Sequence, residues 1–241
     1  QYGMVGLSRF PMDGAASRTF RSFLWRDLPG HHMPEGFYSA EAEAALPLSS
    51  KSHWDLPIVV GDQVLHVWAS HPTPPVFDGD EDRNGRRNFD EIGFWRAYLE
   101  GSEALHDDQG RSGGFSGGAP FVIAGDLNAQ PGATESLYEG MPAIAQLLDH
   151  PRVQDPGDVT RSRGALQGRS PGPPDHPERS TASFLGGVRV DYVLPSSDLT
   201  LVGGGVFWPD PEEDPEGAAL AEAASDHRLV WIDVVLPGGA P

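Results

Sequence analysis

The sequence has no cysteine, which excludes disulfide bonds and thiolate catalysis and leaves the compartment open. It has no apolar run near the roughly 20 residues that a membrane-spanning helix requires. Basic residues are scarce: 17 Lys and Arg stand against 35 Asp and Glu, which gives a formal net charge of −18. This charge disfavours tight, non-specific binding to long nucleic acids, because it repels polyanions at long range. Catalysis on phosphates is still allowed, since bound cations reverse the field locally.

Length and composition fit one globular domain. The chain has 241 residues, of which 38% are hydrophobic, and this is enough for a sizeable core. We therefore expect a single domain over residues 1–241. The 30 Gly and 23 Pro predict that much of this domain is loop.

The stretch 121–129 (FVIAGDLNA) carries the clearest functional signal. A short, partly β-branched apolar run that follows a Gly/Ser/Pro stretch predicts a buried strand. Asp126 and Asn128 would share one face of it, because alternate strand side chains point to the same side. A carboxylate suits a hard cation, and a carboxamide donates to a phosphate oxygen, so this pair predicts a metal and phosphate site.

Hydrophobic patterns predict the other elements. Gly61-Asp62 between two apolar stretches indicates a β-hairpin over residues 58–71. A helix is expected over residues 90–100, with an acidic first turn and a stop at Gly101. The remaining expectations are strands at 2–11, 20–25, 188–194 and 229–236, helical turns at 39–46, a broken helix from 134, a loop or lid at 76–88, and a long surface loop at 150–180.

The histidines differ in their predicted roles. His71 ends a strand before a Pro-rich segment that cannot continue it, so His71 is well placed to face a cleft. His66 lies mid-strand and is better explained as a partly buried structural residue. The adjacent His31 and His32 could bind metal, but neighbours on an irregular segment rarely converge on one ion without further ligands. Residues 51–55 (KSHWD) either line a pocket or form a strand packed under a loop.

Two further acidic positions lie near predicted core strands. Asp191 shares a strand face with Arg189, and a buried carboxylate is costly unless something pairs with it. A purely structural explanation for Asp191 is a salt bridge with Arg189 or another base. Asp226 and His227 stand at the entry to the last apolar strand, where they would face the same kind of cleft as Asp126.

Each motif is common alone, but the order of the motifs is informative. In that order the chain resembles the endonuclease/exonuclease/phosphatase superfamily, which includes pancreatic deoxyribonuclease, exonuclease III, sphingomyelinases and inositol polyphosphate phosphatases. The resemblance runs from about Tyr2 to Leu236. It rests on five segments: LSRFP at 7–11, SHPTP at 70–74, GDLNA at 125–129, RVDYV at 189–193 and SDH at 225–227.

The resemblance implies a fold and a reaction. The fold is α+β, a four-layer α/β/β/α sandwich of two mixed β-sheets (deoxyribonuclease I-like), and the activity is metal-dependent hydrolysis of a phosphoester. The cofactor would be Mg2+ or Mn2+, which would neutralise charge on the phosphoryl group.

The resemblance also assigns roles to residues. Asp126 and Asp226 would contact the metal, and Asp126 would also orient the attacking water. Asn128 would hold the scissile phosphate. His227, oriented by Asp191, would be the general base or a phosphate ligand. His71 would donate to a phosphate oxygen or assist the leaving group, and such general acid–base help is worth typically ~10²–10⁴-fold.

One departure from the family pattern concerns the N-terminus. Family members begin with a strand that bears an Asn, and a later Leu-Gln-Glu-like segment supplies a metal-binding Glu. Neither precedes Tyr2, and the chain opens on Gln1 without a signal peptide. We therefore expect a C-terminal portion of the fold with its N-terminal strands missing, and an isolated chain that is weakly active or inactive without the upstream segment of its parent.

Alternatives remain open at this stage. The chain could be a degenerate, non-catalytic family member used as a binding or scaffold domain, or a structural Gly/Pro-rich surface protein. The retained motif residues argue against the first, and the long core strands argue against the second. The substrate could be nucleic acid, a phospholipid headgroup or a small phosphoester, although the acidic surface disfavours a processive nuclease. Similarity to bacterial extracellular members favours secretion or a periplasmic location.

Overall fold

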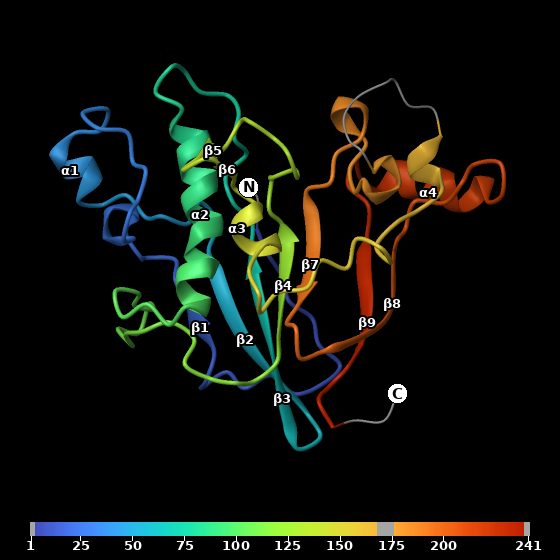
Figure 1. Ribbon diagram of the computed structural model, residues 1–241, viewed down its shortest axis with the longest axis horizontal. Coiled ribbons are helices and arrows are strands. Elements are labelled where there is room, and N and C mark those ends of the chain that lie inside the picture. Colours follow the sequence, from blue (N-terminus) through green and yellow to red (C-terminus); the bar gives the residue numbers. More distant parts are fainter. Residues whose placement is uncertain (1–2, 168–175, 239–241) are drawn as a thin grey trace. The chain divides into compact units, whose positions relative to one another are not determined.

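The computed structural model describes residues 3–167 and 176–238 and has the predicted α+β fold class (Figure 1). The chain divides into two compact units, Gln1–Pro151 (unit 1) and Arg152–Pro241 (unit 2). Within the described part of the chain, every helix is too short or too polar to cross a membrane.

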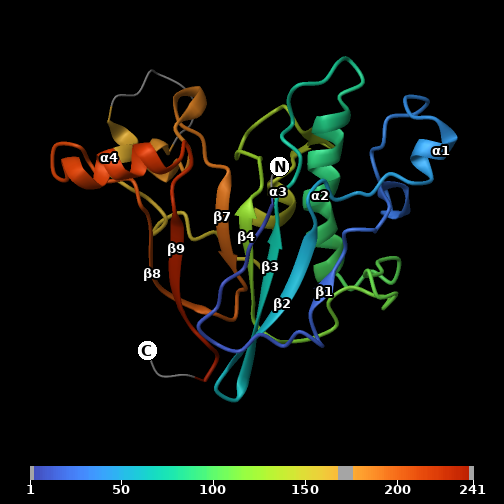
Figure 2. The ribbon, with the colours of Figure 1, turned by 180° about the vertical axis from the view of Figure 1, so that it is seen from behind.

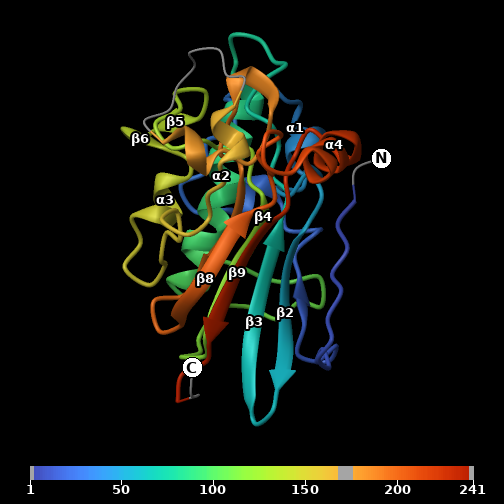
Figure 3. The same ribbon diagram turned by 90° about the vertical axis from the view of Figure 1, so that its right-hand side faces the viewer.

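Unit 1 contains a mixed sheet in which four strands follow one another in the order β1 (Arg18–Thr19), β2 (His53–Val60), β3 (Gln63–Ser70) and β4 (Phe121–Asp126). β2 and β3 form the predicted antiparallel hairpin, which begins at His53 rather than at residue 58. Figure 3 shows this long hairpin from the side. β3 and β4 are parallel, so their C-terminal residues, Ser70 and Asp126, lie at the same edge of the sheet.

Helix α2 (Arg83–Leu99) covers one face of this sheet (Figures 1 and 2). Its Trp95 stacks on Trp68 of β3 with 5.4 Å between the ring centroids. Trp68 also stacks on Phe121 of β4, with a centroid separation of 4.2 Å. All three rings are buried. Because each ring comes from a different element, this aromatic stack ties the helix to both strands.

The helix starts at Arg83 rather than at residue 90, so the predicted start is wrong. Asp90 and Glu91 consequently lie in the middle of α2, and they are buried, with 2% and 1% of their surface exposed. Helical periodicity could not reveal this, because donors from other segments satisfy both carboxylates. The predicted loop or lid over 76–88 is correspondingly shorter.

Two predicted strands in unit 1 are wrong. Residues 3–11 contain no strand and are mostly exposed, and Tyr2 lies outside the described residues. Residues 20–25 form turns that lead into the 3-10 helix η1 (Trp25–Asp27). The buried side chains there are Phe20, Phe23 and Trp25, and this spacing does not alternate as a strand requires.

The rest of unit 1 follows the prediction in part. α1 (Ala40–Glu43) confirms the helical turns at 39–46. The broken helix from 134 is wrong at its start, because β5 (Leu137–Tyr138) and β6 (Met141–Pro142) form a small antiparallel hairpin there. Only α3 (Ala145–Leu148) is helical in that region.

Unit 2 contains β7 (Asp191–Pro195), an antiparallel pair β8 (Thr200–Val206) and β9 (Val230–Val235), and α4 (Pro215–Ala224) (Figure 2). β9 confirms the predicted strand at 229–236. β7 starts at Asp191 rather than at residue 188, so Asp191 opens the strand instead of lying within it. β8 was not predicted, because its three consecutive glycines give no strand signal; at Gly205 a Cβ would lie 3.0 Å from the indole nitrogen of Trp231.

Residues 150–180 are not the solvent-exposed loop that was predicted. Val153, Thr160 and Ala165 are buried, and two 3-10 helices occur, η2 (Gly164–Leu166) and η3 (Pro177–Arg179). A third, η4 (Phe184–Gly186), follows. Residues 168–175 of the predicted loop lie outside the described residues.

Candidate active site

The ends of β3 and β4 approach closely because residue 125 is glycine. Gly125 has a φ of +151°, and a Cβ on it would lie 2.0 Å from the backbone oxygen of Ser70. A larger side chain could be accommodated only by displacing a strand. The approach brings Asp126 beside His71, with 3.4 Å between Oδ2 of Asp126 and Nε2 of His71.

Asn128 lies beside Asp126, but the local structure that places it there differs from the predicted strand. β4 ends at Asp126, and Asn128 lies in a turn with a φ of +50°, a conformation that asparagine tolerates better than most residues. Its backbone N–H donates to Oδ1 of Asp126 at 2.9 Å, and its Nδ2 donates to Oδ2 at 3.3 Å. The two side chains therefore lie together, as expected, but the turn places them rather than strand alternation.

Helix α2 holds the segments that carry these residues. The buried carboxylate of Glu91 accepts the backbone N–H of Ser50 at 2.6 Å and that of Thr73 at 2.6 Å. The backbone oxygen of Glu91 accepts a hydrogen bond from Nε2 of His53 at 2.7 Å. One helical residue thus fixes the loop before β2, the start of β2 and the loop after His71.

Asn88, one turn before Glu91, holds the turn that carries Asn128. Its Nδ2 donates to the backbone oxygens of Thr73 at 2.9 Å and Leu127 at 3.0 Å. Asn88 is fully buried. The amide therefore connects the loop that follows His71 with the turn that carries Asn128, and this limits the freedom of both side chains.

Lys51 lies beside the same turn. Its Nζ donates to the backbone oxygen of Pro72 at 3.2 Å, and Nδ2 of Asn128 donates to that same oxygen at 3.1 Å. Burial lowers the pKa of the Lys51 ammonium, and the carboxylates of Glu91 and Asp126 oppose this shift. The ammonium is therefore a cation next to the predicted metal and phosphate residues.

In unit 2 the predicted Asp191 and His227 form a hydrogen-bonded pair. Nδ1 of His227 lies 2.9 Å from one carboxylate oxygen of Asp191 and 3.1 Å from the other. An ionised carboxylate only accepts, so Nδ1 carries the proton and Nε2 of the neutral ring carries the lone pair. The predicted structural partner of Asp191 was Arg189 or another base: Arg189 pairs with Asp155 instead, and the base beside Asp191 is His227.

Residues 181–183 bring this pair together. Oγ1 of Thr181 accepts the backbone N–H of Asp191 at 3.0 Å, and the backbone oxygen of Thr181 accepts that of Arg228 at 2.7 Å. Ala182 forms a β-bridge with His227. The same short segment therefore positions the start of β7 and the histidine in front of β9.

Asp226 presents its carboxylate to solvent. The residue is exposed, and its backbone oxygen accepts a hydrogen bond from the N–H of Ser183 at 2.9 Å. Its side chain is therefore available to a ligand, and a metal role for it stays a prediction.

Three other histidines, His32, His53 and His66, have structural contacts. His66 is half-buried, as predicted, and its Nδ1 bonds to Asp55 at 2.7 Å. His32 bonds through Nδ1 to Asp90 at 2.7 Å, which raises its pKa despite burial, so it serves a hydrogen bond rather than an ion shared with His31. His53 is buried on the helix side of β2, whereas Lys51 lines a hollow. The pocket explanation therefore fits Lys51, whereas the strand that begins at His53 packs under helix α2 rather than under a loop.

Within unit 1 the structure groups His71, Asp126 and Asn128, and within unit 2 it groups Asp191 and His227. Sequence reasoning missed Glu91, Asn88 and Thr181. Asn88 lies at helical spacing from Ile92, Trp95 and Leu99, so a polar residue on the apolar stripe of α2 was a usable signal. Thr181 gave no such sequence signal, because its role depends on contacts between segments that are distant in the sequence.

Comparisons with known proteins give a consistent result. The model of the Endonuclease/Exonuclease/phosphatase family matches residues 1–227. The chain is similar in structure to the endonuclease/exonuclease/phosphatase from Beutenbergia cavernae DSM 12333, with a TM-score of 0.55 and 19% identity over 96% of this chain and 47% of that chain. It is also similar to an endonuclease/exonuclease/phosphatase family protein from Leptotrichia buccalis C-1013-b, with a TM-score of 0.42 and 13% identity over 79% of this chain and 55% of that chain.

The first of these likenesses shows the fold. This chain spans about half the length of that structure, 47%. The comparison with curated protein sequences gave no match.

Proposed function

The chain belongs to the endonuclease/exonuclease/phosphatase family, and on that premise we propose that it is a metal-dependent phosphoester hydrolase. Residues 1–241 would then act as one domain. The proposed site combines His71, Asp126 and Asn128 of unit 1 with Asp191, Asp226 and His227 of unit 2. The family match supports this combination, because it covers both groups of residues.

The observation that carries the proposal is the bond between His227 and Asp191. The carboxylate accepts from Nδ1 and so leaves the lone pair on Nε2, which is the arrangement a general base requires. His227 is half-buried. Asp191 acts here as the residue that fixes the ring orientation and tautomer.

The proposed reaction is hydrolysis by direct attack of water. Water attacks phosphorus, its oxygen forms a new P–O bond, and Nε2 of His227 takes the proton that it loses. The bond from phosphorus to the leaving oxygen breaks, and His71 supplies the proton that converts this oxygen to an alcohol. The products are the phosphate with one new oxygen and the free alcohol, so atoms and charge balance.

Asn128 would bind a non-bridging phosphate oxygen. Both hydrogens of its amide are engaged, one by Pro72 at 3.1 Å and one by Asp126 at 3.3 Å. A phosphate oxygen would replace Asp126 as the acceptor of the longer bond. This exchange becomes favourable when a cation occupies the carboxylate of Asp126.

The carboxylates present fit a divalent cation. Mg2+ and Mn2+ prefer oxygen ligands, and Asp126 and Asp226 offer carboxylate oxygens that are not enclosed in the core. These two residues would hold the ion, which would supply charge neutralisation at the phosphoryl group.

Hydrolysis of bis-p-nitrophenyl phosphate tests the proposal. We expect turnover that is weak in the isolated chain, requires Mg2+ or Mn2+, stops with a chelator, and falls roughly 10²-fold or more in Asp126→Asn and in His227→Gln. Asp233→Asn, on exposed β9, is the matched control and should keep the wild-type rate. Equal turnover by all four proteins would contradict the proposal.

A further inference from the structure

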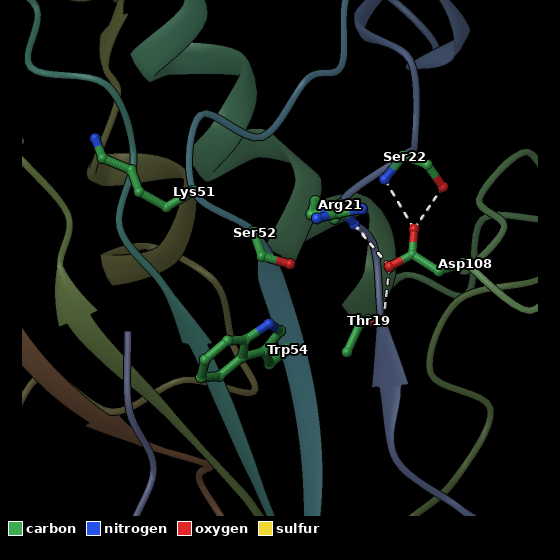
Figure 4. A pocket seen from close by; sticks show the side chains of 7 residues that line it. All are labelled: Thr19, Arg21, Ser22, Lys51, Ser52, Trp54 and Asp108. Atoms are coloured by element: carbon green, nitrogen blue, oxygen red, sulfur yellow. Dashed lines mark hydrogen bonds between the residues drawn. The ribbon is translucent and has the colours of Figure 1, made fainter. Parts of the chain in front are cut away.

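Lys51 is the one lysine in the chain, and the other 16 of its 17 Lys and Arg residues are arginines. It lies in unit 1, two residues before β2. Figure 4 shows the side chains around a hollow at the start of this strand, and the ammonium of Lys51 points away from the other six. The ammonium donates instead to the backbone oxygen of Pro72 at 3.2 Å. Lys51 therefore serves the loop that follows His71 rather than the hollow.

The backbone beside Lys51 is fixed to the same loop. The hydroxyl of Ser50 donates to the backbone oxygen of His71 at 3.3 Å. The backbone N–H groups of Ser50 and Thr73 both donate to the carboxylate of Glu91 at 2.6 Å. The backbone and the tip of the lysine are thus both held against this loop, so the ammonium has a defined position before any ligand binds.

The ammonium is also a neighbour of Asn128. Nδ2 of Asn128 donates to the same Pro72 oxygen at 3.1 Å, so the two nitrogens are no further apart than these two hydrogen bonds together. Burial lowers the pKa of the Lys51 ammonium, and the carboxylates of Glu91 and Asp126 are near enough to oppose this shift. The lysine therefore lies beside both the amide proposed to bind phosphate and the carboxylate proposed to bind the metal.

Most of the hydrogen-bonding capacity of Lys51 is unused. An ammonium has three hydrogens, and the Pro72 oxygen accepts one of them. Within residues 3–167 and 176–238, no carboxylate forms an ion pair with Lys51. Two hydrogens of a half-buried cation are thus available to an anionic ligand.

The alternative is that Lys51 only satisfies the Pro72 carbonyl. A neutral amide can do this, and Asn128 already supplies one. A half-buried cation also costs free energy unless negative charge compensates it. The carboxylate of Glu91 is engaged by backbone N–H groups, and that of Asp126 would be engaged by the metal. An anionic ligand is therefore the compensation that the lysine requires.

We infer that Lys51 is a further catalytic residue, which donates to a non-bridging oxygen of the phosphate that Asn128 binds. The inference rests on the proposed function, because it takes the phosphate at Asn128 as the scissile one. Neighbouring amide and ammonium donors can each bind one oxygen of the same phosphate. The fixed ammonium would then offset the negative charge that develops on these oxygens as water attacks.

Lys51→Gln tests the inference, because glutamine can still donate to Pro72 but carries no charge. In hydrolysis of bis-p-nitrophenyl phosphate, kcat/KM should fall about tenfold, which corresponds to ~1.4 kcal/mol. Lys51→Arg keeps the charge and should recover most of this loss. The matched control is Arg26→Gln, an exposed arginine of η1, which should keep the wild-type rate. Equal losses in Lys51→Gln and Lys51→Arg, each with a lower Tm, would show a structural role and overturn the inference.

Amine acylation tests the same contact without turnover. Because Lys51 is the one lysine, acetylation of a lysine side chain reports on this residue alone, and peptide mass analysis gives the modified fraction. Inorganic phosphate with Mg2+ should slow the acetylation of Lys51 in the wild-type chain. Chloride at the same ionic strength should leave the rate unchanged. Equal rates with phosphate and with chloride would contradict a phosphate contact.

The two measurements separate this inference from the proposed function. If the diester is hydrolysed but Lys51→Gln is as active as Arg26→Gln, Lys51 is not a phosphate ligand and the hydrolase stands. If the wild type does not hydrolyse the diester but phosphate protects Lys51, the lysine binds phosphate and the hydrolase proposal fails.

Discussion

Single side chains decide the chemistry of this protein. In the proposed reaction, the bond of Asp191 to Nδ1 determines which nitrogen of His227 acts as the base. Gly125 has no side chain, yet its absence allows Asp126 to lie beside His71. Both residues act by controlling the position of another group.

Asp191→Asn should lower the rate of hydrolysis without removing a group that touches the substrate. The amide can present its NH2 to the ring and so reverse the tautomer, which takes the lone pair away from Nε2. We expect a loss in kcat of roughly 10²-fold or more with little change in KM. The kcat–pH profile should also move, whereas Asp233→Asn should leave both profile and rate unchanged. A loss confined to KM would contradict this role.

Gly125→Ala should destabilise unit 1 and separate Asp126 from His71. The added Cβ would lie 2.0 Å from the Ser70 oxygen, so β3 or β4 must shift. Gly118→Ala is the control, because a Cβ there meets nothing within 4 Å. Circular dichroism melts should show a lower Tm for Gly125→Ala alone, and equal melting of the two variants would show that the close approach is not required.

His53 makes stability depend on pH. Burial lowers the pKa of His53 to about 4, below its ordinary value of 6.5. Below pH 6.5 the unfolded chain therefore binds a proton at this ring that the folded chain does not take up, and this favours unfolding. The contribution of the neutral ring is complete above pH 6.5 and falls as the pH drops toward 4.

Melting curves recorded across this interval should show Tm falling with pH more steeply in the wild type than in His53→Gln. Comparing slopes rather than absolute Tm values removes any constant cost of the substitution. Parallel slopes would show that His53 does not titrate in the way that its burial requires.

At the scale of elements, α2 is the part that organises unit 1. Its apolar residues pack on the sheet, and its two polar residues on the same side, Asn88 and Glu91, hold the loops that carry His71 and Asn128. A loop fixed by several hydrogen bonds from a helix loses little further freedom when substrate binds, which favours a preorganised site.

Glu91→Gln should weaken both fold and activity. One acceptor oxygen is replaced by NH2, so one of the backbone N–H groups of Ser50 and Thr73 is left unpaired, at a cost of about 1–3 kcal/mol. We expect a lower Tm and a lower kcat in hydrolysis of bis-p-nitrophenyl phosphate. Glu100→Gln, at the exposed end of the same helix, is the matched control and should change neither quantity. Wild-type kcat in Glu91→Gln would show that the loops keep their places without the carboxylate.

The strands that bear local signals could be predicted from the sequence. The β2–β3 hairpin has a Gly-Asp turn between apolar runs, and β4 and β9 are apolar runs of the usual strand length. The start of α2 could not be predicted, since residues 83–88 are polar and charged and become helical through contacts such as that of Asn88. Strand β8 was missed for a related reason, because the need for glycine at position 205 comes from the Trp231 ring of the neighbouring strand.

The residues of the candidate site could be proposed from the sequence, but the contacts that hold them could not be predicted. Asp126, Asn128 and His71 were named from their places at predicted strand ends, and the order of the motifs added roles for Asp191 and His227. Their geometric partners Glu91, Asn88 and Thr181 act across long sequence separations, so no local pattern exposes them. The reason for the pairing of Asp126 with Asn128 was also wrong, because a turn with positive φ replaces the expected strand.

At the scale of the whole molecule, we propose that residues from both units take part in one reaction. Unit 1 supplies a carboxylate beside a histidine, and unit 2 supplies a second carboxylate–histidine pair. Each group alone lacks part of what the proposed hydrolysis needs. Unit 1 has the Asn128 amide that would bind the phosphate but no oriented base. Unit 2 has the proposed base, His227, but no such amide. The match to one family over residues 1–227 supports their union.

Cross-linking tests this union most directly, and the lack of native cysteine makes the experiment clean. The double variant His71→Cys/His227→Cys is treated with a short bifunctional thiol reagent, beside the control His71→Cys/Val202→Cys, whose second position is exposed on β8. Our account predicts rapid intramolecular cross-linking of the first pair, read as a mass increase of one bridging group, and none in the control. If both thiols of the first pair react separately and never become bridged, the proposed common site does not exist.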